Sequence, residues 1–213
     1  YAIPLRLVGS EMCIRDRVQG YGLKEVDFRG SNFKDHPIDL IGNNDILSIT
    51  RPDIIEEIHQ SYLEAGADLI ETNTFNANSI SQADYQMEHM VYDLNLHSAK
   101  IAKTISDRFT NSNPKKPRFV CGAIGPTNQT ASMSPDVSDP GHRNVDFDQL
   151  VDSYKEQAKG LIDGGVDILM IETVFDTLNC KAALFAIQSL FIEIGKEIPV
   201  IVSGTITDAS GRL

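Results

Sequence analysis

The strongest constraint on the fold is a sequence pattern that occurs twice. AGADLIETNTF, at residues 65–75, recurs in related form as GGVDILMIETVF at residues 164–175. In each copy a helical pattern ends at a glycine, and a short apolar run follows. A helix that leads into a strand at two distant places predicts an α/β chain, because all-α and all-β folds do not alternate the two elements.

Capping signals set the bounds of the two helices that lead into these strands. We predict that the first helix opens at Thr50, with Asp53 three residues later as a variant of the capping box. Gly66 is expected to end it in the left-handed conformation. The second helix is predicted to begin at Asp146 as its N-cap and to stop at Gly164.

Short apolar runs elsewhere in the chain extend the alternation. Buried strands are predicted near residues 68–70, 118–122, 167–171 and 199–202, and helical patterns separate them around 81–108, 147–163 and 177–194. Strands joined by helices predict a parallel sheet, since parallel neighbours need a crossover connection.

The strand ends favour a closed barrel over an open dinucleotide-binding sheet. No GxGxxG follows a strand; the nearest match is GAIGP at residues 122–126. Polar residues instead close the strands, as expected for a (β/α)8 barrel, whose chemistry gathers at the carboxyl ends of its strands. The segment 122–144 is rich in Pro, Ser, Thr and Asn and is predicted to be a functional loop over that end.

Composition narrows the class of partner. The 213 residues carry 19 Lys and Arg against 30 Asp and Glu, a net charge of −11, which argues against a nucleic-acid partner. No apolar run is expected to approach the roughly 18 residues that cross a bilayer, so we predict no membrane partner and a cytoplasmic protein. Cys13, Cys121 and Cys180 are far apart and fit neither a disulfide framework nor a zinc finger.

Acidic residues at the strand ends predict a binding pocket. Glu71, Glu172 and Asp208, if they point inward, would suit a small ligand with an ammonium group. Alternatively, each glutamate caps the next helix or pairs with a neighbouring strand. No lysine lies at these ends, so a Schiff-base aldolase is disfavoured.

The remaining metal-capable side chains show no metal motif. The five histidines lack HExxH or similar spacing; His59 and His97 are expected on helices as surface or packing residues, whereas His142 lies in the long loop. Cys121 ends a strand, and we interpret it as a buried small apolar residue rather than a metal ligand.

Five long motifs carry a resemblance to a known family. YGLKEVDFRG, DLIGNNDILSITRPDIIEEIHQSYLEAGADLIETNTFNANSISQADY, GAIGPTNQTASMSPDVSDPG, DILMIETVFDTLNCKAALFAI and SGTITDASGR, between residues 19 and 212, closely resemble the homocysteine-binding module of cobalamin-dependent methionine synthases. The resemblance implies a (β/α)8 barrel that binds homocysteine and zinc. It also implies a larger enzyme that moves a methyl group from 5-methyltetrahydrofolate through cobalamin to the homocysteine sulfur, giving methionine.

The resemblance assigns substrate contacts residue by residue. Glu172, in IETVFD, matches the family glutamate that binds the homocysteine amino group. Asn73, in ETNTF, matches a position that lines the same pocket, and Asp208 is expected as a wall residue. The family's three zinc cysteines lie on later strands, so zinc and cobalamin, like the folate- and cobalamin-binding modules, are expected only in the full-length parent.

The start of the chain departs from the family pattern. In the family the first strand leads into an Asp-Gly-Ala-Met-Gly-Thr turn, and here LRLVGSEMCIRDR takes that place. We therefore predict a non-native leader at residues 1–17 and a partial barrel at 18–213, truncated at both ends, with about four strand-helix units. Such a fragment would be inactive alone, because half of the strands of a barrel are missing.

Two rival functions remain open from the sequence. One is a non-catalytic homocysteine-binding or scaffold module. The other is a cobalamin-independent homocysteine methyltransferase with a sulfonium or betaine donor, although the long GAIGPTNQTASMSPDVSDPG stretch favours the cobalamin-dependent type.

Overall fold

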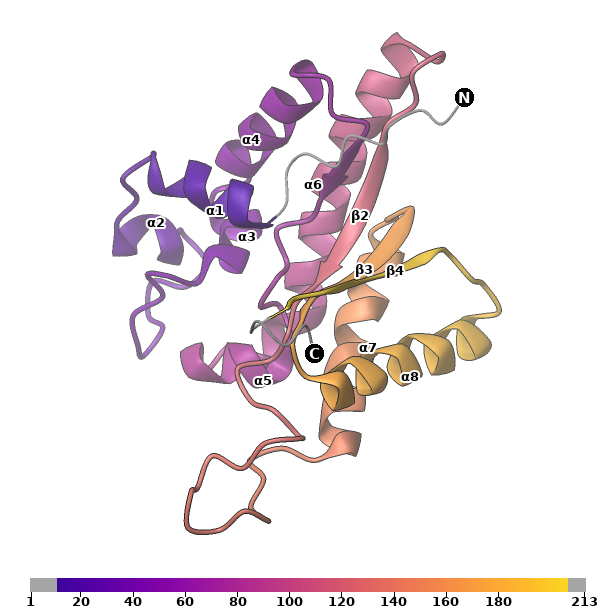
Figure 1. Ribbon diagram of the computed structural model, residues 1–213. Coiled ribbons are helices and arrows are strands. Elements are labelled where there is room, and N and C mark those ends of the chain that lie inside the picture. The colour runs from indigo at the N-terminus through magenta and orange to yellow at the C-terminus, as the bar shows by residue number, and fades with distance from the viewer. Residues whose placement is uncertain (1–10, 207–213) are drawn as a thin grey trace.

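A single parallel sheet organises the computed structural model, which describes residues 11–206 (Figure 1). Its strands follow one another in chain order: β1 (Leu69–Glu71), β2 (Phe119–Ile124), β3 (Ile168–Val174) and β4 (Val200–Gly204). Each neighbouring pair is parallel. The predicted α/β class and all four predicted strands are therefore confirmed.

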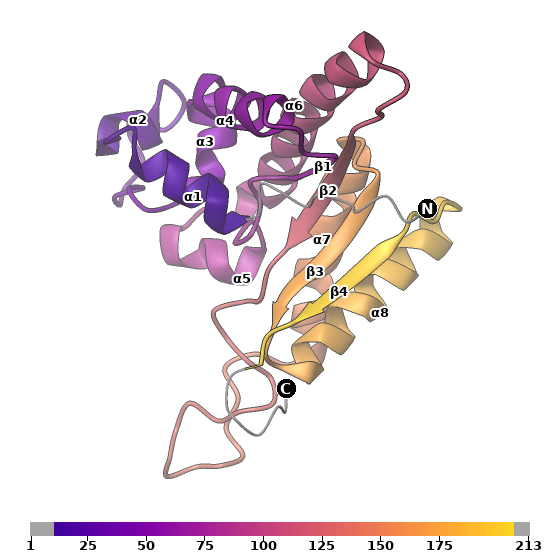
Figure 2. The same cartoon turned by 45° about the horizontal axis from the view of Figure 1, so that its top comes forward.

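Long helices cover one face of this sheet. They are α6 (Val91–Ser112), α7 (Phe147–Asp163) and α8 (Thr177–Ile194), and α4 (Pro52–Glu64) packs beside α6. Figure 2 shows α7 and α8 behind the strands. Ile70, Val120 and Leu169 point from the sheet into the core that these helices complete. Burial of this apolar layer, at roughly 25 cal/mol per Å², is the main source of stability.

Short helical segments form a second core at the amino-terminal end. These are α1 (Glu11–Gln19), α2 (Glu25–Arg29), the 3-10 turn η1 (Asn44–Ile46) and α3 (Leu47–Thr50). Ile14 and Val18 of α1 are buried there with residues of α4 and α6. Part of the predicted leader thus packs against the domain; its foreign origin stays a prediction.

Of the two predicted N-caps, the structure confirms Asp146 and corrects Thr50. Asp146 caps α7, and its side chain and that of Gln149 form the reciprocal capping box. The Thr50 cap is wrong: α4 begins after Arg51, and the Thr50 hydroxyl donates to Ile46 O inside α3. The reason is the extra turn of α3, which uses Thr50 as its last residue.

Glycines end both predicted helices, with one shift. Gly66 has φ of 103° and supplies the left-handed turn after α4. After α7 the left-handed residue is Gly165, with φ of 93°, whereas Gly164 keeps a right-handed backbone. Gly164 is constrained by packing instead, since an added Cβ would lie 2.4 Å from the Ala99 Cβ atom.

The helix predicted around 81–108 is interrupted. The structure has α5 (Ser79–Gln82) and the 3-10 turns η2 (Ala83–Tyr85) and η3 (Glu88–Met90) before α6 begins. Gln86 takes a left-handed conformation with φ of 53°, which breaks the helical hydrogen bonding between the two turns.

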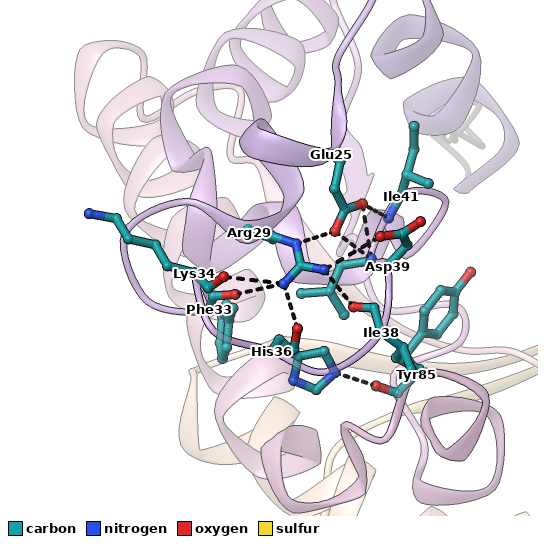
Figure 3. Close-up of polar contacts among 10 residues, drawn as sticks. Glu25, Arg29, Phe33, Lys34, His36, Ile38, Asp39, Ile41 and Tyr85 are labelled. Atoms are coloured by element: carbon teal, nitrogen blue, oxygen red, sulfur yellow. Dashed lines mark hydrogen bonds and ion pairs between the residues drawn. The ribbon is translucent and has the colours of Figure 1, made fainter.

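An arginine organises the loop that follows α2 (Figure 3). The Arg29 guanidinium donates to the carbonyl oxygens of His36, at 2.6 Å, and Ile38, at 2.9 Å, and pairs with Glu25. The Glu25 carboxylate also accepts from the amides of Leu40 and Ile41. Because the fork of Arg29 reaches several carbonyls at once, one side chain fixes most of this loop.

The β4 side of the sheet is open. Among the described residues, β4 pairs with β3 alone, and Ile201 and Val202 are 39% and 48% exposed. On α8, Phe185 and Ile192 are also exposed, at 57% and 75%. Apolar side chains therefore reach solvent on both the last strand and the last helix.

Helix α8 corrects one expectation. Its 18 residues are long and apolar enough to cross a membrane by length and composition, a criterion that the sequence analysis expected no segment to meet. In the structure α8 packs on α7 and β3, and 44% of it is buried. Buried core helices meet the same criterion, so this helix is weak evidence for a span.

Candidate functional site

The carboxyl ends of the strands bring acidic side chains to the face opposite the helices. Cys121 is in register with Glu71 on β1 and with Ile168 on β3. Leu69, Cys121 and Met170 form a small buried cluster separate from the helical core. Since side chains alternate along a strand, Glu172, two residues after Met170, falls on the same face.

The register places Cys121 beside Glu71, and this environment affects the thiol. Burial raises the pKa of the Cys121 thiol, and the nearby carboxylates of Glu71 and then Glu172 raise it further. Cys121 is fully buried, as predicted, and its thiol stays protonated at neutral pH. No cluster of metal-capable side chains surrounds Cys121 among residues 11–206, and it packs with Leu69 and Met170 as a small apolar residue in the floor of the site.

Neither glutamate serves as a helix cap. The N-cap of α5 is Asn78 and the N-cap of α8 is Asp176, each through its own side chain. Glu71 is fully buried, and Glu172 is half-buried. The capping alternative is thereby excluded for both glutamates.

Asn73 lies at the end of β1 but its side chain turns toward the helices. The amide nitrogen donates to Asn44 O at 2.7 Å and to the Ser48 hydroxyl at 3.3 Å. Its backbone amide donates to the Ser98 hydroxyl. Asn73 therefore ties the strand end to η1, α3 and α6, and its role in lining the pocket stays a prediction. Asp208 lies outside the described residues.

Threonines join the first two strand ends. The Thr72 hydroxyl accepts from the amide of Ala123 at 3.0 Å, and the Thr74 hydroxyl donates to Ala123 O at 2.8 Å. The side chain of Gln157, on α7, donates to Thr74 O from the helical side of the sheet. These contacts hold the ETNTF segment against β2, which fixes where Glu71 points.

Two residues that the sequence analysis missed anchor the long loop after β2. Asp176 accepts from the amides of Leu178 and Asn179 and from the Ser132 hydroxyl. Asn179 donates to the Thr127 hydroxyl at 2.9 Å and accepts from the amide of Ala131 at 3.0 Å. A strand end followed by Asp-Thr-Leu-Asn is typical of an N-cap, and that signal could have found them.

The last residues of β3 depart from regular strand geometry beside Glu172. The pairing of β3 with β4 shifts register between Ile171 and Val174. Within that shift, Thr173 has φ of 56°. A β-branched residue rarely adopts this conformation, so the site contains a strained backbone position.

The residues present do not build a metal centre. Within residues 11–206, no three His, Cys, Asp or Glu side chains gather in a way that could hold a metal ion. Cys13, Cys121 and Cys180 form no disulfide in the part of the chain that the structure describes. His142 contacts Asn144 at 3.0 Å in the exposed loop, and His59 is buried in α4. No chemical step is therefore assigned to zinc on these residues.

The chain is similar to one protein family and to solved structures of known proteins. The sequence model of the homocysteine S-methyltransferase family matches residues 17–213. Among solved structures, the metallated form of the homocysteine methyltransferase MmuM from Escherichia coli is similar, with a TM-score of 0.66 and 19% identity. The match covers 92% of this chain and 62% of that protein.

Other forms of the same enzyme give the same result. The oxidized form of MmuM matches with a TM-score of 0.65 and 19% identity, covering 91% of this chain and 60% of that one. The apo form matches with a TM-score of 0.58 and 17% identity, covering 91% and 57%. This chain thus spans about three fifths of the length of these relatives and shares their fold.

Proposed function

Because the chain belongs to the homocysteine S-methyltransferase family, we propose that Glu172 binds the amino group of homocysteine within an enzyme that methylates the homocysteine sulfur. The observation that carries this proposal is that Glu71, in register with Cys121, and Glu172, two residues after Met170, fall on the same face of the sheet, opposite the helices. Both glutamates lie at the carboxyl ends of parallel strands, and barrel enzymes bind their substrates at this end of the strands.

The chemistry of the site suits a zwitterionic amino acid. An α-amino group is protonated in its usual state, and a half-buried carboxylate attracts the resulting cation more strongly than one in bulk water. Hydrogen bonds made by Thr72, Thr74 and Asp176 hold the strand ends in fixed positions. A fixed carboxylate loses little conformational entropy when the ligand binds.

We extend the proposal to the whole reaction through the sequence motifs. The methyl donor would be 5-methyltetrahydrofolate, with cobalamin as carrier, and the partners would be the folate- and cobalamin-binding modules of the full-length cytoplasmic protein. Zinc, when bound by cysteines outside this chain, would lower the pKa of the homocysteine thiol. This chain contributes the amino-group end of the pocket and would be inactive alone.

Ligand binding by the longest polypeptide that the gene encodes tests Glu172. We expect Glu172→Gln to weaken L-homocysteine binding at least about tenfold, since hydrogen bonds to charged groups contribute roughly 1.5–3 kcal/mol. Binding of 4-mercaptobutyrate, which lacks the amino group, should not change. Glu56→Gln, at an exposed position of α4, is the matched control. Unchanged homocysteine affinity in Glu172→Gln would remove the proposed role.

A donor assay separates the catalytic alternatives. Methyl transfer from labelled 5-methyltetrahydrofolate that depends on cobalamin supports the proposed route. Transfer from a sulfonium or betaine donor without cobalamin would favour the independent type, and homocysteine binding without any transfer would favour a scaffold module.

A further inference from the structure

Thr173 occupies an unusual backbone position for its residue type. Of the non-glycine residues that the structure describes, only Gln86 and Thr173 have positive φ. Gln86 ends a 3-10 turn, where such values are common, whereas Thr173 lies inside β3. Strained residues of this kind persist where the surrounding structure fixes them, and they concentrate at ligand sites.

The strain belongs to a β-bulge. Ile171 pairs with Val202, and the next pair along the strands is Val174 with Gly204. Two residues of β3, Glu172 and Thr173, therefore stand opposite one residue of β4. The amide of Thr205 then donates to Val174 O at 2.8 Å, so regular contact resumes directly after the bulge.

The bulge changes which face each side chain occupies. Leu169, Ile171 and Val174 all belong to the core on the helical side of the sheet. In a regular strand, Val174 would lie on the face opposite Ile171, because side chains alternate. The extra residue returns Val174 to the helical side of the sheet and leaves Glu172 on the face opposite the helices. Asp176 then follows in position to cap α8.

We propose that Thr173 is a positioning residue: its left-handed backbone holds the bulge that keeps Glu172 on the face opposite the helices, where the homocysteine amino group would bind. This inference rests on the proposed function, since it assumes that Glu172 binds the homocysteine amino group. Thr173 acts through Glu172 and needs no contact of its own with the ligand. Bulges next to active sites commonly re-aim a side chain in this way.

Substitutions that differ in their tolerance of positive φ test the proposal. Thr173→Gly accepts the conformation and is the rescue variant. Thr173→Pro excludes it, because the proline ring fixes φ near −65°. With L-homocysteine as probe, we expect Thr173→Gly to bind within about twofold of wild type and Thr173→Pro at least about tenfold more weakly, which is the effect of a lost charged hydrogen bond.

Two further measurements separate positioning from general damage. Binding of 4-mercaptobutyrate should be unchanged in Thr173→Pro, and the double variant Glu172→Gln/Thr173→Pro should bind homocysteine no more weakly than Glu172→Gln alone. If far-UV circular dichroism shows that Thr173→Pro is unfolded, Thr173→Ile replaces it, with the same pattern expected at about threefold or more. A bulkier β-branched side chain disfavours positive φ without removing the amide.

The outcomes are distinct. Equal losses in Thr173→Gly and Thr173→Pro, equal weakening of both ligands, or an additive double variant would overturn the positioning role. If Glu172→Gln alone leaves homocysteine affinity unchanged, the proposed function fails instead. If Glu172→Gln weakens binding and neither Thr173→Pro nor Thr173→Ile does, only the inference about Thr173 fails.

Discussion

Replacing Gly160 by alanine places a methyl group in the contact between α6 and α7. An added Cβ would lie 2.7 Å from Tyr92 O and 2.8 Å from the Asn95 Cβ atom, both on α6. Ordinary contact begins at 3.4 Å, so the two helices have to separate by about 0.7 Å. Asn95 is also held by hydrogen bonds to Ala77 O and Val91 O, which resist such a shift.

Two opposing effects decide whether Gly160→Ala raises or lowers the free energy of unfolding. Alanine is favoured over glycine inside a helix by about 1 kcal/mol, which alone would stabilise the protein. Overpacking of a close contact costs about 1–3 kcal/mol, and the atoms in the way here include backbone that cannot rotate aside. We expect the clash to win, with a net loss of about 1–2 kcal/mol in the free energy of unfolding.

Urea denaturation followed by far-UV circular dichroism measures this loss. At a slope of about 2 kcal/mol per M, the midpoint of Gly160→Ala should fall by roughly 0.5–1 M. Asp152→Ala, at an exposed position of the same helix, is the control and should change stability by less than about 0.5 kcal/mol. A midpoint at or above that of the wild type would refute the close-packing argument.

Two other residues give predictions of a different kind. Burial lowers the pKa of His59 from 6.5 to about 4, so His59 takes up a proton in the unfolded chain before it does so in the folded protein. The contribution of neutral His59 to the free energy of unfolding is therefore fully present above pH 6.5. It falls by about 3 kcal/mol as the pH drops toward 4. In His59→Leu that dependence should be absent from urea midpoints measured across this range, and an unchanged profile would contradict it. Arg29→Lys keeps the charge but loses the fork that binds His36 O and Ile38 O, so we expect about 1–2 kcal/mol lower stability and faster proteolysis within residues 30–41. Equal proteolysis rates for Arg29→Lys and wild type would refute the proposed role of Arg29.

Periodicity and caps predicted most of the fold because they are local. The buried runs gave the four strands, and the Asp146 capping box gave the start of α7, since both depend on neighbouring residues in the chain. The Thr50 cap was wrong because its environment is not local. The short helix α3 that ends at Thr50 is held by tertiary packing, and no neighbouring residues in the chain signal it.

The site was predictable in its residue types and not in its geometry. Glu172 stood out as an acidic residue at a strand end, but the strand-end rule alone cannot say which way a side chain points. The Thr173 bulge depends on the pairing of β3 with β4, and the turn of the Asn73 side chain toward the helices depends on η1 and α3. Such contacts join segments far apart in the chain, where sequence patterns carry little information.

Within residues 11–206 the outer edge of β4 has no neighbouring strand, and we expect this edge to favour self-association. Peptide groups on such an edge, next to exposed valine and isoleucine, are a template onto which another extended chain can add. Dilute handling, low temperature and early capture during purification therefore suit it better than concentration. A short charged peptide that adds a strand alongside residues 200–204 would be a rational stabiliser for crystallisation.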